Sequence, residues 1–115
     1  MLPVMPRPSL DLYGTLADPI RRAILDRLRR GPRPVNQLAQ DFPVSRPAIS
    51  RHLRVLRQAR LVRERRDGRH RYYTLEPAPL GELDNWLESY RALLTSSLNR
   101  LKQHVEARPD KKEER

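Results

Sequence analysis

Two short helical patterns separated by a tight break constrain the fold more than any other part of this sequence. Apolar residues recur at three- and four-residue steps over residues 35–42 and again over 46–59. The segment 43–45, Pro-Val-Ser, predicts a turn between them, with Ser45 as the N-cap of the second helix. Pro47 fits that helix because its missing N–H falls in the first turn, where no intrahelical partner exists. This arrangement predicts a helix–turn–helix.

The segment that follows, residues 61–75, predicts a β-hairpin. Asp67-Gly68 is among the strongest two-residue hairpin signals, because a type I′ turn requires positive φ at both central positions. Arginines crowd the tip of this hairpin. The side chains expected to face the body of the domain are Val62, Tyr73 and Leu75.

Capping residues and prolines predict the remaining helices. Asp18-Pro19 marks a helix start, an N-cap acceptor followed by proline at the first helical position, and Gly31-Pro32 ends that helix. Ser9 is the N-cap candidate of a shorter helix before it. An apolar stripe predicts one long helix over 81–107. The order helix, helix, helix–turn–helix, hairpin and long helix predicts a mainly α fold, a winged helix–turn–helix with a long C-terminal helix.

Basic residues are concentrated in the middle of the chain. The 115 residues include 21 Arg and 3 Lys against 14 Asp and Glu, which gives a formal net charge of +10. Ten of the arginines lie between Ser45 and Leu75, and only Glu64 and Asp67 offset them, so this segment carries +8. The guanidinium group grips phosphates and base edges bidentately. Arg-rich coding alone would explain the composition, but its concentration here favours a nucleic-acid partner.

The helix over 46–59 separates apolar from basic residues around its axis. Ile49, Leu53 and Leu56 fall on one side and are expected in the core. The opposite side carries Pro47, Ser50, Arg51, Arg54 and Gln58, flanked by Arg46 and Arg57. A charged face that is merely solvated normally contains Asp or Glu at four-residue spacing, and this helix contains neither. The pattern therefore predicts a helix that enters the major groove of DNA.

The tip of the predicted hairpin is also basic. Its residues with this character are Arg65, Arg66, Arg69, His70 and Arg71. A thin basic ribbon beside a groove-binding helix contacts backbone phosphates or the minor groove. The alternative is an edge hairpin that charge protects from aggregation. Both interpretations hold together, because the number of basic groups exceeds what edge protection requires.

Three segments resemble the ArsR/SmtB family of dimeric winged-helix repressors. They are LADPIRRAILDRL (16–28), VNQLAQDFPVSRPAISRHLRVLRQARLV (35–62) and RRDGRHRYYTL (65–75), of which SRPAISRHLRVL is the most specific. The final helix, with LDNWLESYRALL (83–94), resembles the metal-independent members, in which this helix builds the dimer. The resemblance implies a helix from Ser45 that binds operator DNA and a hairpin that adds flanking contacts.

The resemblance also assigns candidate DNA contacts. It implies contacts from Ser45, Arg46, Ser50, Arg51, His52 and Arg54, and a hairpin contact from Arg69. The exposed basic pattern adds Pro47, Arg57, Arg66 and Arg71 to the DNA-binding candidates. His52 falls near the buried edge of its helix, so a structural or phosphate-side hydrogen bond competes there with a base contact.

One position departs from the family pattern. The family usually has Ala-Gly-Leu after the DNA-binding helix, with glycine as the left-handed C-terminal cap. This chain has Ala59-Arg60-Leu61 instead. Either Arg60 adopts a positive φ, or the geometry of the helix end differs.

The sequence predicts no metal site, no cofactor and no catalytic activity. It contains no Cys, and the segment 35–42 offers only Asp41 as a metal ligand. The last helix holds His104 without the partners of a ligand set. His52 and His70 belong to two other predicted elements, so no nucleophile, base and orienter come together. We therefore expect no enzyme and no metal sensor.

The long helix has more apolar residues than a small domain can cover. Part of its stripe covers the core of its own domain, and the surplus is expected to pair with the same helix of a second chain. The residues expected at this dimer interface are Leu10, Tyr13, Leu83, Trp86, Leu87, Tyr90, Leu94, Leu98 and Leu101. A two-fold dimer would present two DNA-binding helices roughly 34–36 Å apart and predicts a palindromic operator.

These features predict one domain over 9–107, between a flexible arm (1–8) and a disordered charged tail (108–115). The expected protein is a homodimeric repressor that binds double-stranded DNA. We expect it in the cytoplasm, because no apolar run approaches a membrane span of about 20 residues and no signal-peptide pattern is present. One alternative is a winged-helix adaptor that docks an acidic protein. Another is an RNA-binding regulator, which is disfavoured because the exposed helix face lacks aromatic residues. The sequence identifies neither the operator nor an effector.

Overall fold

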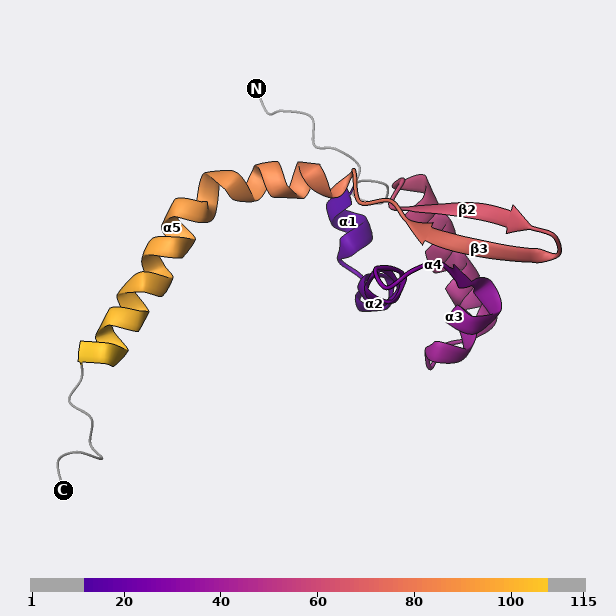
Figure 1. Cartoon of the computed structure of the whole chain (residues 1–115), viewed down its shortest axis with the longest axis horizontal. Coiled ribbons are helices and arrows are strands. Elements are labelled where there is room, and N and C mark those ends of the chain that lie inside the picture. The colour runs from indigo at the N-terminus through magenta and orange to yellow at the C-terminus, as the bar shows by residue number, and fades with distance from the viewer. Residues whose placement is uncertain (1–11, 108–115) are drawn as a thin grey trace, which may run out of the picture. The chain divides into compact units, whose positions relative to one another are not determined.

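The computed structural model describes residues 12–107 of the chain (Figure 1). Four predicted features lie outside the described residues: the arm over 1–8, the cap Ser9, the interface residue Leu10 and the tail over 108–115. The chain divides into two compact units after Leu83.

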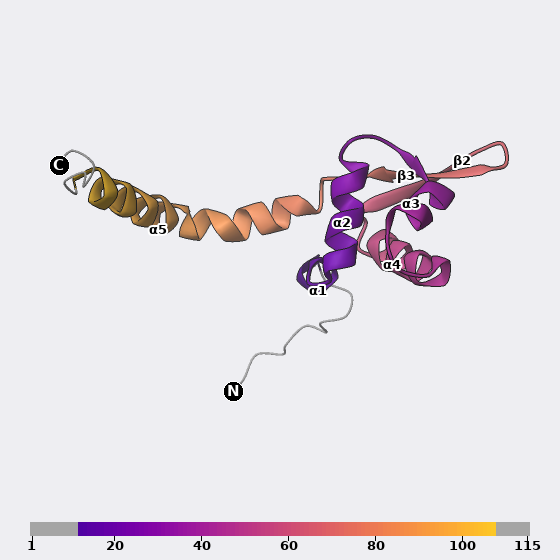
Figure 2. The ribbon, with the colours of Figure 1, turned by 90° about the horizontal axis from the view of Figure 1, so that it is seen from below.

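The first unit is the predicted winged helix–turn–helix. Its elements are α1 (Leu12–Leu16), α2 (Pro19–Leu28), β1 (Arg33–Pro34), α3 (Val35–Asp41), α4 (Arg46–Gln58), β2 (Val62–Asp67) and β3 (His70–Leu75). The strands form an antiparallel sheet in the order β1-β3-β2. Figures 1 and 2 both show the tip of the β2–β3 hairpin extending beyond the helices. We call this hairpin the wing.

Two side-chain caps fix the starts of α2 and α4. The carboxylate of Asp18 accepts hydrogen bonds from the backbone N–H groups of Ile20 (2.8 Å) and Arg21 (3.1 Å). The hydroxyl of Ser45 accepts one from the N–H of Ala48 (3.2 Å). The N-caps predicted at Asp18 and Ser45 are confirmed.

The core of the first unit takes residues from helices and strands alike. Its buried apolar side chains are Leu12, Ile24, Leu25, Leu28, Leu38, Ile49, Leu53, Leu56, Leu61, Val62 and Tyr73. Val62 and Tyr73 anchor the base of the wing in this core, and Leu75 packs against it, as the alternation of the hairpin predicts. Because the wing is anchored at its base, its position is fixed relative to α4.

The turn of the wing differs from the prediction. Asp67 pairs with His70, so the two loop residues are Gly68 and Arg69 rather than Asp67 and Gly68. Within the described residues, Gly68 has a φ of 65° and Arg69 is not among the residues of positive φ. Positive φ at the first central position alone is the type II′ pattern, which requires glycine only there. Asp67 therefore ends β2, and Arg69 lies at the tip.

Strand β1 has no counterpart in the sequence prediction. Arg33 pairs with Tyr73 and Pro34 with Tyr72, so the segment between α2 and α3 adds a third strand to the hairpin. A strand of two residues that includes proline carries no periodicity. It forms because the adjacent edge of β3 offers unpaired backbone groups.

α4 ends through an arginine in the left-handed region. Arg60 has a φ of 62°. Its N–H donates to the carbonyl of Arg57 (2.9 Å), and the N–H of Leu61 donates to the carbonyl of Leu56 (2.9 Å). These two hydrogen bonds define a Schellman cap, in which glycine usually occupies the left-handed position. Of the two alternatives raised by the sequence, positive φ at Arg60 is confirmed.

The long C-terminal helix is confirmed as α5 (Leu80–Ala107). Its first turn belongs to the first unit, where Leu80 and Leu83 pack against the core. The rest of α5 forms the second unit, in which the large apolar side chains from Trp86 to Val105 are exposed. No helix among residues 12–107 is long and apolar enough to cross a membrane.

Candidate nucleic-acid interface

α4 has one buried face and one exposed basic face, as predicted. Ile49, Leu53 and Leu56 are at most 1% exposed. The residues predicted for the other face are all exposed, namely Arg46, Pro47, Ser50, Arg51, Arg54, Arg57 and Gln58. Within the described part of the chain, the side chains of Arg46, Arg51 and Arg54 form no hydrogen bond or ion pair. Their charges are therefore uncompensated and accessible to an anionic partner.

The wing adds exposed arginines on both sides of its turn. Arg65 and Arg66 project from β2, and Arg69 lies at the tip, all three exposed and without an ion pair among residues 12–107. Arg63 differs, since its guanidinium lies 2.9 Å from the carboxylate of Glu76. Among the described residues, the wing thus has three arginines without an ion pair, one at its tip and two on the adjoining part of β2, where a ribbon reaches DNA.

Glu64 connects α4 to both strands of the wing. One carboxylate oxygen lies 3.6 Å from the guanidinium of Arg57 on α4, and the other lies 3.5 Å from that of Arg71 on β3. The hydroxyl of Tyr73 donates to the second oxygen at 3.2 Å. Burial raises the pKa of the Tyr73 phenol, and the neighbouring Glu64 carboxylate raises it further. Arg57 and Arg71, both predicted to contact DNA, therefore already have an acidic partner within the protein.

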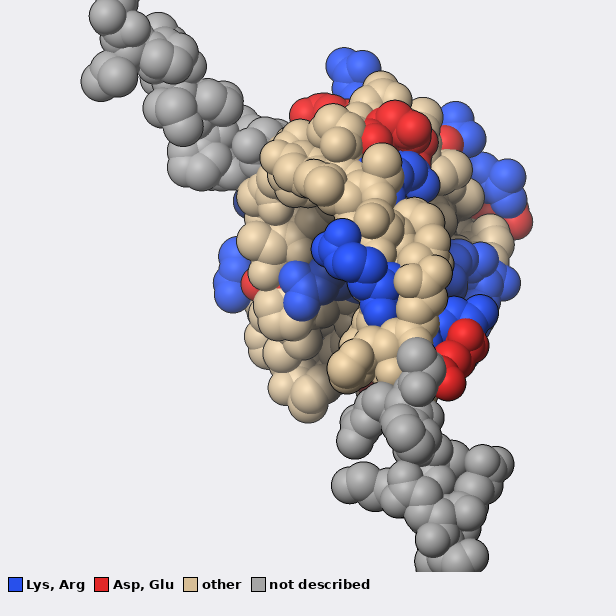
Figure 3. Space-filling view, turned by 90° about the vertical axis from the view of Figure 1, so that its left-hand side faces the viewer, with Lys and Arg blue, Asp and Glu red and all other residues tan. Residues whose placement is uncertain are grey.

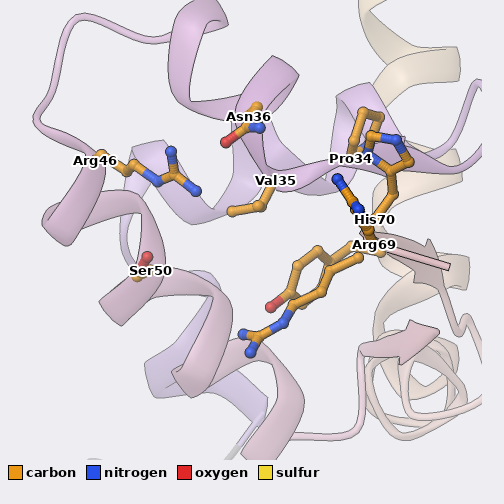
Figure 4. A pocket seen from close by; sticks show the side chains of 9 residues that line it. Pro34, Val35, Asn36, Arg46, Ser50, Arg69 and His70 are labelled. Atoms are coloured by element: carbon orange, nitrogen blue, oxygen red, sulfur yellow. The ribbon is translucent and has the colours of Figure 1, made fainter. Parts of the chain in front are cut away.

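A hollow of about 260 Å³ separates α4 from the wing (Figure 4). Figure 4 shows Arg46 and Ser50 on its α4 side, Asn36 and Val35 on α3, and Arg69 and His70 at the wing. Arg71, Tyr73 and Pro34 complete the lining, which contains no Asp or Glu. The hollow brings together four residues that the sequence predicts as DNA contacts: Arg46, Ser50, Arg69 and Arg71.

His52 takes part in a hydrogen-bond network with α2. Its Nδ1 lies 3.3 Å from the guanidinium of Arg21, which also donates to the carbonyls of Thr15 (2.8 Å) and Gly14 (3.3 Å). Arginine only donates, so Nδ1 is the acceptor in this contact. The structural hydrogen bond considered for this residue is therefore present, and a phosphate contact would have to come from the opposite ring nitrogen.

The same network affects Asp18. Burial raises the pKa of its carboxyl, but the hydrogen bonds from the N–H groups of Arg21 and Ile20, together with the charge of the Arg21 guanidinium, bring it below its ordinary value. The guanidinium of Arg21 lies 4.0 Å from this carboxylate. Arg21 thus joins α1, α2 and α4 at the root of the DNA-binding helix.

Acidic and basic side chains are mixed on another face of the molecule. On the face shown in Figure 3, acidic side chains lie among the basic ones, with uncharged surface between them. Among residues 12–107, no three His, Cys, Asp or Glu side chains come close enough to hold a metal ion. On α4 and the wing, by contrast, Arg46, Arg51, Arg54, Arg65, Arg66 and Arg69 form a group of exposed arginines without an acidic partner among residues 12–107.

Three residues of this site have no role that the sequence predicts. From the sequence Glu64 is only an acid that reduces the net charge, and Asn36 and Arg21 have no assigned function. The observation that would indicate a structural role for Glu64 is its position opposite Tyr73 in the hairpin register. That register depends on the turn, which the sequence placed one residue too early.

A winged helix–turn–helix whose DNA-facing helix is basic and free of acids defines a class of DNA-binding regulators. Comparison with known proteins narrows this class. Residues 18–64 match the family model described as bacterial regulatory protein, arsR family.

Two curated relatives extend the match beyond the helix–turn–helix. The chain is 50% identical over 78 residues to the HTH-type transcriptional regulator Rv2034 of Mycobacterium tuberculosis, covering 68% of this chain and 73% of that protein. It is 35% identical over 80 residues to the transcriptional repressor SdpR of Bacillus subtilis, covering 70% and 89%. An ArsR-like transcriptional regulator from Rhodococcus sp. RHA1 superposes with a TM-score of 0.62 at 33% identity, covering 84% and 92%. The chain belongs to the ArsR family of bacterial regulatory proteins, and it is a DNA-binding transcriptional regulator rather than an enzyme.

Proposed function

We propose that this protein is a transcriptional repressor that binds a palindromic operator as a homodimer and carries no metal-sensing site. The exposed face of α4 is the observation that carries the proposal. Arg46, Arg51 and Arg54 have no acidic partner among the described residues, and Ser50 lies exposed between them. In the major groove such a face offers bidentate donors to guanine and a hydroxyl to either base or phosphate. The cytoplasm is the compartment in which such a repressor acts.

The proposed DNA contacts include every candidate from the sequence, with different roles. Ser45 caps α4 and Pro47 lies in its first turn, so both bring this turn to the DNA, while Arg51 and Arg54 are the candidates for base contacts. Arg66 and Arg69 reach flanking phosphates from the wing. Arg57, Arg71 and His52 have partners within the protein, so their contact with DNA requires an exchange of partners.

The second unit supports the homodimer. Trp86, Leu87, Tyr90, Leu93, Leu94, Leu98, Leu101 and Val105 are between 37% and 66% exposed in a single chain. A soluble protein rarely leaves a continuous apolar stripe of this kind in water. Pairing with the same stripe of a second chain would bury it, with Tyr13, 39% exposed on α1, contributing from the first unit.

Two separate observations support the proposals that this protein represses transcription and that it has no metal-sensing site. The relative from Bacillus subtilis is named a transcriptional repressor, and it is matched over 89% of its length. The described residues contain no cluster of metal ligands, and the chain contains no Cys. We infer that a signal other than a metal ion, if any, releases this protein from DNA.

Selection of bound fragments from the host genome tests the proposal. Fragments that contain an inverted repeat, with half-sites about one helical turn apart, would support it. On the selected operator, Arg51→Ala is expected to cost about 1–3 kcal/mol and to reduce discrimination against mutated half-sites. A protein that enriches no fragment and gives no salt-sensitive shift with duplex DNA would instead support the protein-docking adaptor.

A further inference from the structure

The hollow between α3, α4 and β3 has the chemistry of an anion site. Three arginines line it, from two different elements, and no acidic side chain does. Arg46 and Arg69 have no ion pair among residues 12–107, so their charges are available to a ligand. Arg71 is held at 3.5 Å by Glu64, which fixes its guanidinium beside the hollow. The net positive charge of the lining favours a ligand with at least one negative charge.

The neutral residues of the hollow suit a phosphate. Ser50 contributes a hydroxyl and Asn36 an amide, both of which donate to phosphate oxygens. Figure 4 shows Arg46 and Ser50 on one side of the hollow and Arg69 and His70 on the other, so donors come from opposite sides. A volume of about 260 Å³ leaves room for a tetrahedral phosphate with its ordered water.

The position of the hollow relates it to the DNA backbone. When a winged helix binds DNA, its helix enters the major groove and its wing reaches the flanking minor groove. The sugar–phosphate strand that separates these grooves passes between the two elements. In this protein the space between α4 and the wing is the hollow.

We propose that this hollow seats a single backbone phosphate of bound DNA, which Arg46 from α4 and Arg69 from the wing hold jointly. The inference rests on the proposed function, because the phosphate belongs to the duplex that α4 enters. A shared phosphate fixes the wing to α4 through the DNA itself. It thereby sets the register of α4 in the major groove without contacting any base.

The salt dependence of duplex binding tests the sharing of one phosphate. Each neutralised phosphate contributes about 0.9 to the slope of log affinity against log salt. We expect the double variant Arg46→Gln/Arg69→Gln to lower the slope for a mixed-sequence duplex by about 0.9, whereas two separate phosphates would lower it by about 1.8. The matched control is Arg29→Gln/Arg30→Gln, which removes the same charge from exposed residues outside the hollow and is expected to keep the wild-type slope.

The outcomes separate this inference from the proposed function. A loss of about 1.8 overturns the shared phosphate, and a slope equal to that of the control overturns the hollow as a DNA site. In either case the wild-type protein still binds DNA and the proposed function stands. If the wild-type protein binds no duplex at any salt concentration, the proposed function itself fails.

Inorganic phosphate provides the second arm of the test. In the absence of DNA, its titration is expected to shift the side-chain N–H signals of Arg46 and Arg69 in NMR spectra, while those of Arg29 and Arg30 stay in place. If free phosphate shifts these signals but the double variant keeps the wild-type slope on DNA, the hollow binds free phosphate instead of the backbone, and the proposal is overturned.

Discussion

Arg57 of α4 and Glu64 of the wing lie 3.6 Å apart, and the same carboxylate holds Arg71 at 3.5 Å. An acid at the centre of a DNA-binding surface opposes phosphate, so its presence here requires a reason. Glu64 is half-buried and accepts a hydrogen bond from Tyr73, which makes it a junction between helix and hairpin rather than a free surface charge. In the free protein it pairs with two arginines, Arg57 and Arg71, that would otherwise be available to contact phosphate.

Glu64→Gln is therefore expected to increase non-specific DNA binding. The amide still accepts the hydrogen bond from Tyr73, but it no longer holds Arg57 and Arg71 by charge. Their release would steepen the salt slope by about 1 to 2, because each new phosphate contact adds about 0.9. Titration of a mixed-sequence duplex at several salt concentrations measures this change. Glu76→Gln is the control, since Glu76 pairs only with Arg63 within the described part of the chain. An equal effect of both variants would show that Glu64 acts through net charge alone.

Arg60 limits the stability of the first unit. A non-glycine residue in the left-handed region costs about 1–2 kcal/mol, and part of the gain from glycine is offset by its flexibility in the unfolded chain. Arg60→Gly is therefore expected to raise the free energy of unfolding by about 1 kcal/mol. Urea denaturation measures the change.

Arg60→Ala separates backbone strain from charge. It removes the same guanidinium but keeps the positive φ of 62°, so no stabilisation is expected. Equal stabilisation by both variants would mean that repulsion among neighbouring arginines, and not the backbone, is the cost at this position.

Asp18 links stability to acid pH. Because its folded-state pKa is below the ordinary value of 3.8, the carboxylate contributes stability above pH 3.8, and this contribution is lost as the pH falls through the folded-state pKa. Asp18→Asn keeps a good N-cap but does not titrate, so its stability is expected to fall less steeply below pH 3.8. Asp18→Ala also loses the cap, at a cost of about 1 kcal/mol at neutral pH. Thermal unfolding as a function of pH checks both; parallel acid limbs for the wild type and Asp18→Asn would exclude Asp18 as the titrating group.

Strong local signals made the fold predictable. The caps Asp18 and Ser45 and the apolar faces of the helices act over a few residues, so their structural result can be worked out without knowing the rest of the chain. Arg60 is a further local signal. Its place where the family has glycine predicts either a positive φ or a different helix end, and the φ of 62° and the cap hydrogen bonds of α4 identify the first.

The remaining errors come from contacts across strands. The turn at Gly68 was placed one residue early because Asp-Gly favours a type I′ turn, whereas pairing of Asp67 with His70 allows type II′. Strand β1 exists only because β3 lies beside it. Glu64 meets Arg57 and Arg71 only after the hairpin has folded onto α4. Relationships of this kind depend on register, which no single-sequence pattern reports.

The apolar stripe of α5 gives the test of dimerisation. Leu98 and Leu101 lie on the exposed stripe, and each buried leucine contributes about 1.5–3 kcal/mol. Because Leu98→Glu/Leu101→Glu changes both chains of a dimer, we expect the dissociation constant of the dimer to rise by at least about a thousandfold. Sedimentation equilibrium should then give the 13.6 kDa of a single chain where the wild type gives twice this mass.

The control for this prediction is Ser96→Glu/Gln103→Glu, which adds the same charge to the polar side of the same helix. It is expected to remain a dimer and to bind the operator like the wild type. The Leu98→Glu/Leu101→Glu protein should keep its affinity for mixed-sequence duplex per chain but lose the preference for an inverted repeat, because a single chain spans one half-site. If both double variants have the mass of the wild type, the stripe of α5 is not the surface that joins two chains.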